Sequence, residues 1–198
     1  MPSENRVEIE NSTDEELILS FQNGDEKAYN EIVRRYKDRL TNFIYRYVGS
    51  LDECEDIVQD TLVKVYISKD LYKEIAKFST WIYTIAINLA KTRAIKKQKH
   101  KIFSLSSVFT DDEKDFDIED ESMQTDLDIS SSIQEIHIQK ALNSIPDSYR
   151  KLVILRDVED FSYEEISEMT GLPMGTVKSR INRGRERLQK LLKNIYKE

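Results

Sequence analysis

Basic and amide side chains gather in the C-terminal stretch of this sequence, from Met174 to Glu198. The stretch holds eight Lys or Arg residues against two acids, Glu186 and Glu198. Guanidinium and ammonium groups can bind guanine or phosphate, and the amide of Asn can pair with adenine. The candidate DNA-contacting residues are Thr176, Lys178, Ser179, Arg180, Asn182, Arg183 and Arg185. A charge run on its own is also typical of a solvated helix that closes a small bundle.

Two short helices around a tight turn are predicted to position these side chains. Ser162 and Glu165 have the spacing of a capping box, which starts the first helix, and Gly171 can turn the chain after it. One face of the second helix is apolar or small at helical spacing: Val177, Ile181, Gly184 and Leu188. With that face inward, Ser179 and Asn182 point directly away from it. The pattern predicts a helix-turn-helix, whose second helix lies in the major groove of DNA.

A second candidate surface lies on a helix predicted from about Phe78 to about Lys97. Opposite its apolar stripe stand Thr80, Thr84, Asn88 and Lys91, with Tyr83 close by. From Lys91 to Lys101 the basic residues continue with no acid among them. This face suits single-stranded DNA, because bases can stack on aromatic rings while the phosphates are neutralised. The alternative is that the aromatic residues belong to the core; we favour it for Trp81, and both interpretations stay open for Tyr83.

Four apolar stripes at helical spacing predict a four-helix bundle over residues 12–102. The first helix starts at a second capping box, Thr13 with Glu16, and the next ends at Gly49. Cys54 falls on an inward position of the third helix, where we expect a small buried hydrophobe. The segment 68–77 loses the periodicity and is predicted to be a loop. With five Gly and three Pro in the whole chain, the sequence indicates an all-α fold.

An acidic stretch separates the bundle from the helix-turn-helix. Between Asp111 and Asp128 there are ten acidic residues against Lys114 alone. Self-repulsion and few apolar residues predict an extended or disordered segment, so 103–132 is interpreted as a flexible acidic linker. Residues 133–198 then form the second helical domain. The formal net charge of −7 therefore averages acidic and basic segments that we expect to meet different partners.

Several classes of protein are excluded by composition. A single cysteine permits no intramolecular disulfide, and no run of about eighteen apolar residues predicts a membrane span. The N-terminus carries no apolar signal core, so we expect a cytoplasmic protein. His100 and His137 are the only histidines and stand apart from any cluster of Cys or carboxylates, so no metal or cofactor is expected. Without a nucleophile–base pair or a Gly-rich phosphate loop, we expect no enzyme.

Four segments in this order resemble the extracytoplasmic function (ECF) family of sigma factors, the promoter-recognition subunits of bacterial RNA polymerase. The segments are 56–60 (DIVQD), 78–88 (FSTWIYTIAIN), 163–166 (YEEI) and 175–180 (GTVKSR). The resemblance covers nearly the whole chain. It implies a region-two domain for core-polymerase and −10 element binding at 12–102, and a region-four domain for −35 element binding at 133–198.

Residue roles follow from the same resemblance. Contacts with core polymerase are implied for Asp56, Gln59 and Asp60. Contacts with the melted −10 element are implied for Tyr72, Phe78, Trp81, Tyr83, Asn88, Lys91 and Arg93. The −35 element would be bound by the seven residues of the second helix named above, with Arg180 and Arg185 nearer the flanks, where phosphate is the expected partner. The family is usually restrained by an anti-sigma factor, so the expected partners are core polymerase, promoter DNA and such a factor.

Three departures and two alternatives accompany this interpretation. Asp60 stands where the family more usually has glutamate, which gives the same charge a shorter reach. Ile87 stands where the family often has a basic residue, and Gly184 stands where alanine is common, which costs roughly 1 kcal/mol of helix propensity unless it permits close packing. One alternative is a stand-alone helix-turn-helix regulator, which requires a dimer to match paired half-sites. The other is a protein-interaction bundle that binds no DNA, which would leave both basic clusters unexplained.

Overall fold

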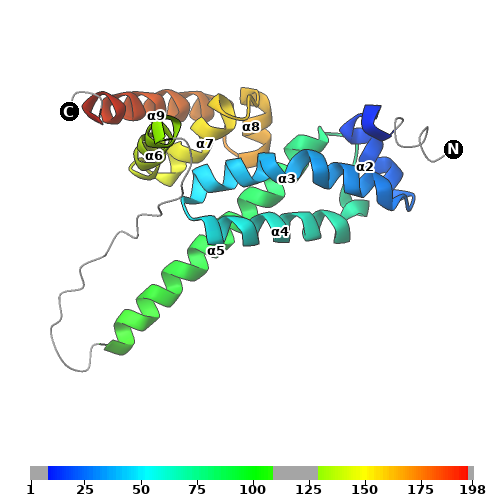
Figure 1. Ribbon diagram of the computed structural model, residues 1–198, viewed down its shortest axis with the longest axis horizontal. Coiled ribbons are helices and arrows are strands. Elements are labelled where there is room, and N and C mark those ends of the chain that lie inside the picture. Colours follow the sequence, from blue (N-terminus) through cyan, green and yellow to red (C-terminus); the bar gives the residue numbers. More distant parts are fainter. Residues whose placement is uncertain (1–8, 109–128, 196–198) are drawn as a thin grey trace.

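The computed structural model describes residues 9–108 and 129–195, and over these ranges the regular structure is entirely helical. Five elements form the first domain: α2 (Asp14–Gln22), α3 (Glu26–Val48), α4 (Leu51–Ile67), the short 3₁₀ helix η1 (Lys69–Leu71) and α5 (Phe78–Val108). Four form the second: α6 (Ile129–Asn143), α7 (Asp147–Asp157), α8 (Tyr163–Thr170) and α9 (Met174–Ile195). The prediction of an all-α chain with two small helical domains is confirmed (Figure 1).

The first domain is a bundle around the long helix α3, which packs on α2, α4 and α5. Its apolar stripe supplies Ile32, Tyr36, Leu40, Phe43 and Ile44, all fully buried. The predicted capping box closes the start of α2: Thr13 donates its backbone N–H to Glu16, and Glu16 donates its own to the Thr13 hydroxyl. These bonds satisfy N–H groups that have no partner within the helix.

Cys54 is buried as predicted, and its thiol donates to the carbonyl of Thr41, 3.2 Å away. Burial in apolar surroundings raises the pKa of the Cys54 thiol to about 11. The thiolate form is therefore disfavoured, and the residue serves packing.

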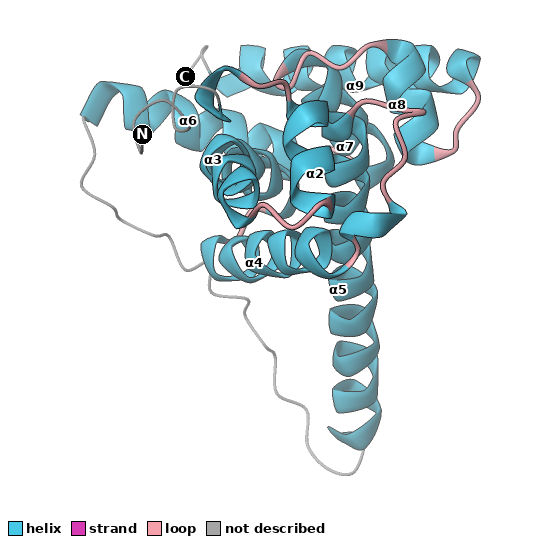
Figure 2. Ribbon diagram, turned by 90° about the vertical axis from the view of Figure 1, so that its right-hand side faces the viewer, coloured by secondary structure: helices cyan, strands magenta, loops and turns pink. Residues whose placement is uncertain are grey.

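Helix α5 is longer than the sequence pattern indicated. It continues past the expected end near Lys97 to Val108, and Figures 1 and 2 show this half leaving the bundle. The basic stretch contains no Gly or Pro to end the helix, which is the physical reason for the extension. Helix α6 likewise begins at Ile129, so both ends of the predicted linker 103–132 are helical. The remainder of that linker, 109–128, lies outside the described residues.

The two domains lie against each other. Helix α8 packs on α5, and α6 and α7 pack on α3 near its C-terminal end. Buried residues of both domains, such as Phe43 and Tyr83 in the first and Phe161 in the second, belong to one continuous apolar core. Figure 2 shows the second domain along one side of the bundle, above the projecting half of α5. Within the part of the chain that the structure describes, no helix is long and apolar enough to cross a bilayer.

Candidate nucleic-acid and polymerase interfaces

The predicted helix-turn-helix is formed by α8, a turn over 171–173, and α9. Ser162 caps α8 through its hydroxyl, which accepts from Glu165 N at 3.1 Å, while Glu165 accepts from Ser162 N at 2.7 Å. Gly171 ends α8 with φ of 67°, a left-handed conformation that side chains with a Cβ rarely adopt. The Ser167 hydroxyl donates to the Leu172 carbonyl at 2.6 Å and fixes the turn. Local sequence therefore sets the angle at which α9 leaves α8.

Helix α9 presents the predicted DNA-reading residues to solvent. Val177 and Ile181 are fully buried and Gly184 is also inside, as the sequence pattern predicted. Of the seven candidates, five are exposed: Lys178, Ser179, Asn182, Arg183 and Arg185. Thr176 and Arg180 are half-buried at the flanks. One helix face thus offers hydrogen-bond donors and positive charge, which is the arrangement that a major groove requires.

Two of these cations already have partners within the second domain. The Arg185 guanidinium binds both carboxylate oxygens of Asp157, at the end of α7, with its Nε 2.9 Å from Oδ2. The Lys178 ammonium lies 5.5 Å from the centre of the Tyr163 ring. Arg185 is therefore anchored to the scaffold, whereas Arg183 and Asn182 are exposed on the central part of the face.

Gly184 lies where two helices of the second domain pack closely. An added Cβ at this position would lie 2.6 Å from a methyl group of Val153 on α7. The glycine therefore allows α9 and α7 to approach closely, at a cost in helix propensity.

The aromatic candidates on and before α5 are mostly inside the protein. The exposed fractions are 4% for Tyr72, 0% for Phe78 and 0% for Tyr83. Of the two interpretations left open for Tyr83, the structure agrees with the core position: Phe161 and Glu159 of the second domain contact its ring and its hydroxyl. Thr80, predicted on the polar face of α5, is buried as well. Asn88 and Lys91 are exposed as expected, and Trp81 and Arg93 are half-buried.

Tyr72, from the loop 68–77, packs its ring against Phe78 and Trp81 at the start of α5. Ring centres are 5.7 Å apart for Tyr72 and Phe78 and 5.5 Å apart for Tyr72 and Trp81. The Tyr72 hydroxyl donates to the carbonyl of Ala76 at 2.9 Å, so the ring is held inward.

Sequence reasoning missed the apolar residues that this loop exposes. Leu71 is 71% exposed and Ile75 is 88% exposed, in a segment otherwise rich in charge. The sequence did contain a signal for them. Both are large apolar residues in a stretch without helical periodicity, so they belong to no apolar stripe that faces the core.

The candidate polymerase-binding residues lie exposed on α4. Asp56 and Asp60 have side chains 65% and 52% exposed, and Gln59 between them is exposed too. Arg93 from α5 bridges the two carboxylates, at 2.8 Å from Asp56 and 2.7 Å from Asp60.

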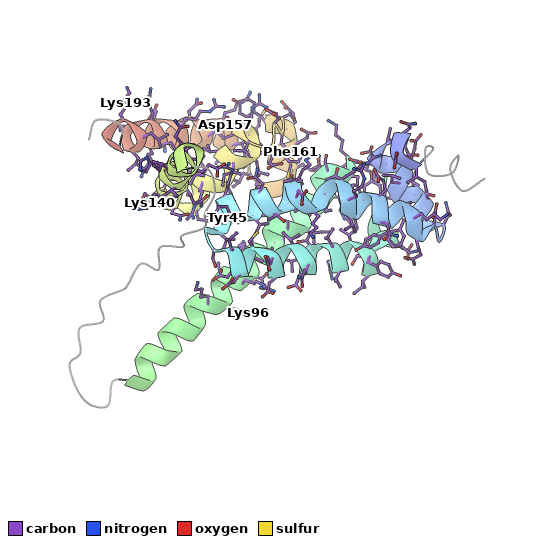
Figure 3. All side chains as sticks on the ribbon, viewed as in Figure 1. Tyr45, Lys96, Lys140, Asp157, Phe161 and Lys193 are labelled. Carbon is purple, nitrogen blue, oxygen red and sulfur yellow. The ribbon has the colours of Figure 1, made fainter. Side chains whose placement is uncertain are left out.

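This ion-pair network is unexpected, because Arg93 had been assigned to DNA and the aspartates to polymerase. Arg93 therefore joins the two predicted surfaces, and farther along α5 Lys97 forms a second ion pair with α4, to Glu53. Beyond Arg93, Lys96 marks the basic continuation of α5 away from the bundle (Figure 3).

Comparison with known proteins agrees with both domains. Residues 32–100 match the family described as Sigma-70 region 2, and residues 136–188 match Sigma-70, region 4. The chain is 34% identical over 180 residues to the ECF RNA polymerase sigma factor SigW of Bacillus subtilis, covering 90% of this chain and 96% of that protein. It is 31% identical over 184 residues to the ECF RNA polymerase sigma-E factor of Haemophilus influenzae, covering 91% and 95%.

A solved structure shares the arrangement. The sigma factor RpoE of Bartonella quintana, crystallised with the anti-sigma factor NepR, superimposes with a TM-score of 0.65 at 28% identity, covering 84% of this chain and 98% of that one. The fold and the matches to both family models define a bacterial transcription initiation factor. The chain belongs to the ECF family of RNA polymerase sigma factors. It therefore directs polymerase to promoters, and the stand-alone dimeric regulator is set aside.

Proposed function

We propose that the two domains divide promoter recognition between them, with boundaries at 12–102 and 133–198 and a connecting segment at 103–132. The observation that supports this most directly is the separation of charge. Helix α4 exposes Asp56 and Asp60, while α9 exposes a basic face. An acidic surface attracts a basic surface on polymerase, and a basic surface attracts DNA phosphate. Asp56, Gln59 and Asp60 are then the core-polymerase contacts.

In the second domain, α9 would lie in the major groove of the −35 element. Arg183, Lys178 and Asn182 are the side chains best placed for base edges, because they are exposed and centred on the outward face. Ser179, which points outward beside Asn182, would lie near the base edges as well. Thr176, Arg180 and Arg185 would bind or approach the phosphate backbone and hold the register.

In the first domain, α5 and the loop before it would hold the melted strand of the −10 element. Asn88, Lys91 and Arg93 would bind its backbone, since they follow one another along the basic half of the helix. The packed rings of Tyr72, Phe78 and Trp81 would hold the loop in place. At the exposed edge of the loop, Leu71 and Ile75 would contact unstacked bases. Tyr83 would join this surface only after the second domain moves away.

The remaining partners are also proposals. RpoE of Bartonella quintana is known in complex with the anti-sigma factor NepR, and we infer that an anti-sigma factor restrains this protein as well. The protein would act in the cytoplasm, on the polymerase that occupies that compartment. Its contribution would be binding and strand capture, without metal, cofactor or chemistry of its own.

Run-off transcription tests the proposal. Purified core polymerase is incubated with a pool of promoter fragments, with and without the protein, and new transcripts starting at fixed sites are expected. The Asp56→Lys/Asp60→Lys double variant should lose core binding, measured by fluorescence titration of labelled protein. Asp38→Lys, an exposed acid on α3, is the control for charge alone. Equal core binding by the double variant and the unmodified protein would contradict the docking assignment.

A further inference from the structure

Helix α2 contacts both ends of the loop 68–77, because it packs on η1 and on α5. At the last residue of α2, the side-chain amide nitrogen of Gln22 donates to two carbonyls of the loop, that of Lys69 at 2.7 Å and that of Tyr72 at 3.1 Å. Between these two carbonyls lies Leu71, whose side chain is 71% exposed. One amide group therefore holds the backbone on both sides of a residue that the loop presents to solvent.

The loop also returns a contact to the end of the same helix. The Lys69 ammonium donates to the carbonyl of Phe21 at 2.8 Å and lies 4.3 Å from the centre of the Phe21 ring. A cation at the C-terminal end of a helix complements the helix dipole. Helix α2 and the start of the loop are thus joined in both directions, by Gln22 from the helix and by Lys69 from the loop.

The far end of the loop is held by Glu15, which is also on α2. Its carboxylate accepts from the backbone N–H of Phe78, the first residue of α5, at 2.9 Å. N–H groups in the first turn of a helix have no partner within it, and a negative charge is favourable there. Burial, and after it the Glu15 carboxylate, raise the pKa of the Tyr72 hydroxyl, which agrees with the position of Glu15 beside the loop. Glu15 and Gln22 are seven residues apart, so they lie on one face of α2.

These contacts matter because the loop has little apolar packing of its own. Leu71 and Ile75 are 71% and 88% exposed, whereas Tyr72 turns its ring into the core. The backbone N–H groups of Leu71 and Tyr72 donate to nearby carbonyls, those of Ser68 and Lys69. An exposed segment of this kind has many accessible conformations, and fixing one of them in advance reduces the entropy lost on binding. The contacts from α2 therefore decide how Leu71 and Ile75 are presented.

We propose that Gln22 and Glu15 are positioning residues for base recognition, which hold the loop 68–77 in the conformation that receives an unstacked base of the −10 element. This inference rests on the proposed role of the loop in binding the melted strand. Neither residue touches DNA in this proposal, because each acts through the backbone of the loop or of α5. Helix α2 precedes the residues 32–100 that match Sigma-70 region 2, so that match assigns it no role in base recognition.

The first test removes the hydrogen-bond donor without changing the shape of the side chain. Gln22→Glu places an oxygen, in place of the amide nitrogen, opposite the carbonyls of Lys69 and Tyr72, so the loop should detach from α2. The full chain is combined with core polymerase, and run-off transcription is measured on promoters that carry each of the four bases at each −10 position. At the position that the loop reads, the ratio of transcript from the preferred base to that from the other bases should fall about fivefold.

A matched variant controls for the added charge. Asn30→Asp makes the same change of charge at an exposed amide on α3, and it should leave the base preference unchanged. Affinity for −35 duplex should also be unchanged in Gln22→Glu, because α9 belongs to the other domain. An equal loss of base preference in both variants would attribute the effect to charge alone and overturn the proposal.

Glu15 supplies a second pair of variants, which decides the question if Gln22→Glu proves unstable in thermal unfolding. Glu15→Leu removes the acceptor for the N–H of Phe78, so it should lower the base preference. Glu15→Gln keeps an oxygen that can accept the same hydrogen bond, so it should restore the preference. Equal base preference in Glu15→Leu and Glu15→Gln would contradict the positioning role of Glu15.

The conformation of the loop is measured independently by hydrogen exchange, read by mass spectrometry of peptides that span residues 68–77. The amides of Leu71 and Tyr72 should exchange faster in Gln22→Glu than in the unmodified protein, while the core of α3 should exchange at the same rate. Faster exchange in the loop without a loss of base preference would overturn the proposal, and so would unchanged exchange together with unchanged preference.

A double variant of the loop itself separates this inference from the proposed function. Leu71→Ser/Ile75→Ser removes the apolar side chains that are proposed to contact the base, so the base preference should fall. If this double variant keeps the preference, the proposed role of the loop is wrong. If the double variant loses the preference while Gln22→Glu and Glu15→Leu keep it, the positioning role of α2 alone is wrong.

Discussion

Helices α5 and α9 both carry polar and basic residues at helical spacing, and both are proposed to bind promoter DNA, but they present those residues differently. On α9 the residues opposite the apolar stripe are exposed, including Asn182 and Arg183. On α5 the corresponding residues are buried in the first part of the helix, where Thr80 is 3% exposed and Tyr83 contacts Phe161 and Glu159 of the second domain. They are exposed only farther on, at Asn88 and Lys91.

This difference shows what a polar helix face predicts. It indicates that the face lies outside the core of its own bundle, but not that the face is exposed to solvent. What covers it depends on residues far away in the sequence, in this case Glu159 and Phe161. A hydroxyl can be satisfied equally by a carboxylate of a neighbouring domain or by DNA. The following changes distinguish the two uses.

Tyr83→Ala should have the largest effect on folding. The ring is fully buried against Phe43 and Phe161, with centres 5.1 and 4.9 Å away, and its removal leaves a cavity that both domains border. We expect a loss of roughly 3–5 kcal/mol in the free energy of unfolding, measured by urea denaturation. If stability were retained while strand binding disappeared, Tyr83 would be a DNA contact in the manner of Arg183 and not a core residue.

Arg183→Ala should show the opposite behaviour. Because the Arg183 side chain is exposed, its removal should change the free energy of unfolding by less than about 0.5 kcal/mol. Binding to −35 duplex should weaken by about 1–3 kcal/mol at particular base pairs, measured by competition with a panel of single-base substitutions. A uniform loss across the panel would reassign Arg183 to phosphate. Glu186→Ala, an exposed neighbour on the same helix, is the control for changes in helix propensity.

Much of this arrangement could be predicted from the sequence, where the determinants are local. Both capping boxes, the turn at Gly171, and the inward face of Val177 and Ile181 depend on residues within a few positions of one another. The exposure of Asp56, Gln59 and Asp60 follows from the apolar stripe of α4 in the same way.

The parts that sequence reasoning missed depend on long-range contacts. The cover over Tyr83 comes from Glu159 and Phe161, and the bridge from Arg93 to α4 joins residues separated by more than 30 positions. Periodicity reports which face of a helix is apolar, but not which other element the polar face will contact. The added length of α5 was missed for a different reason, since a basic sequence without apolar spacing gives no periodic signal even when it continues a helix.

Two glycine substitutions on α9 test how closely this helix packs on α7. Gly184→Ala gains helix propensity, but its Cβ would meet a methyl of Val153 at 2.6 Å, so we expect a net loss of about 1–2 kcal/mol in stability. Gly175→Ala lies on the same helix with nothing within 4 Å of the added Cβ, and should gain up to about 1 kcal/mol. Thermal unfolding measures both. A gain at both positions would mean that α9 is free to shift away from α7.

Arg93→Ala should have the smallest effect on stability. The variant tests whether Arg93 binds DNA or only aligns α4 with α5. Its ion pairs with Asp56 and Asp60 are largely exposed, so their loss should cost less than about 1 kcal/mol. If Arg93 binds a phosphate of the melted strand, the slope of log affinity against log salt concentration should fall by about 0.7 for single-stranded DNA.

The matching variant, Asp56→Asn/Asp60→Asn, removes the competing carboxylates while keeping Arg93, and should raise strand affinity. An unchanged slope in the first variant together with unchanged affinity in the second would make Arg93 a positioning residue that aligns α4 with α5. Arg93 would then resemble Arg185, which its carboxylate partner Asp157 holds against the scaffold of the second domain.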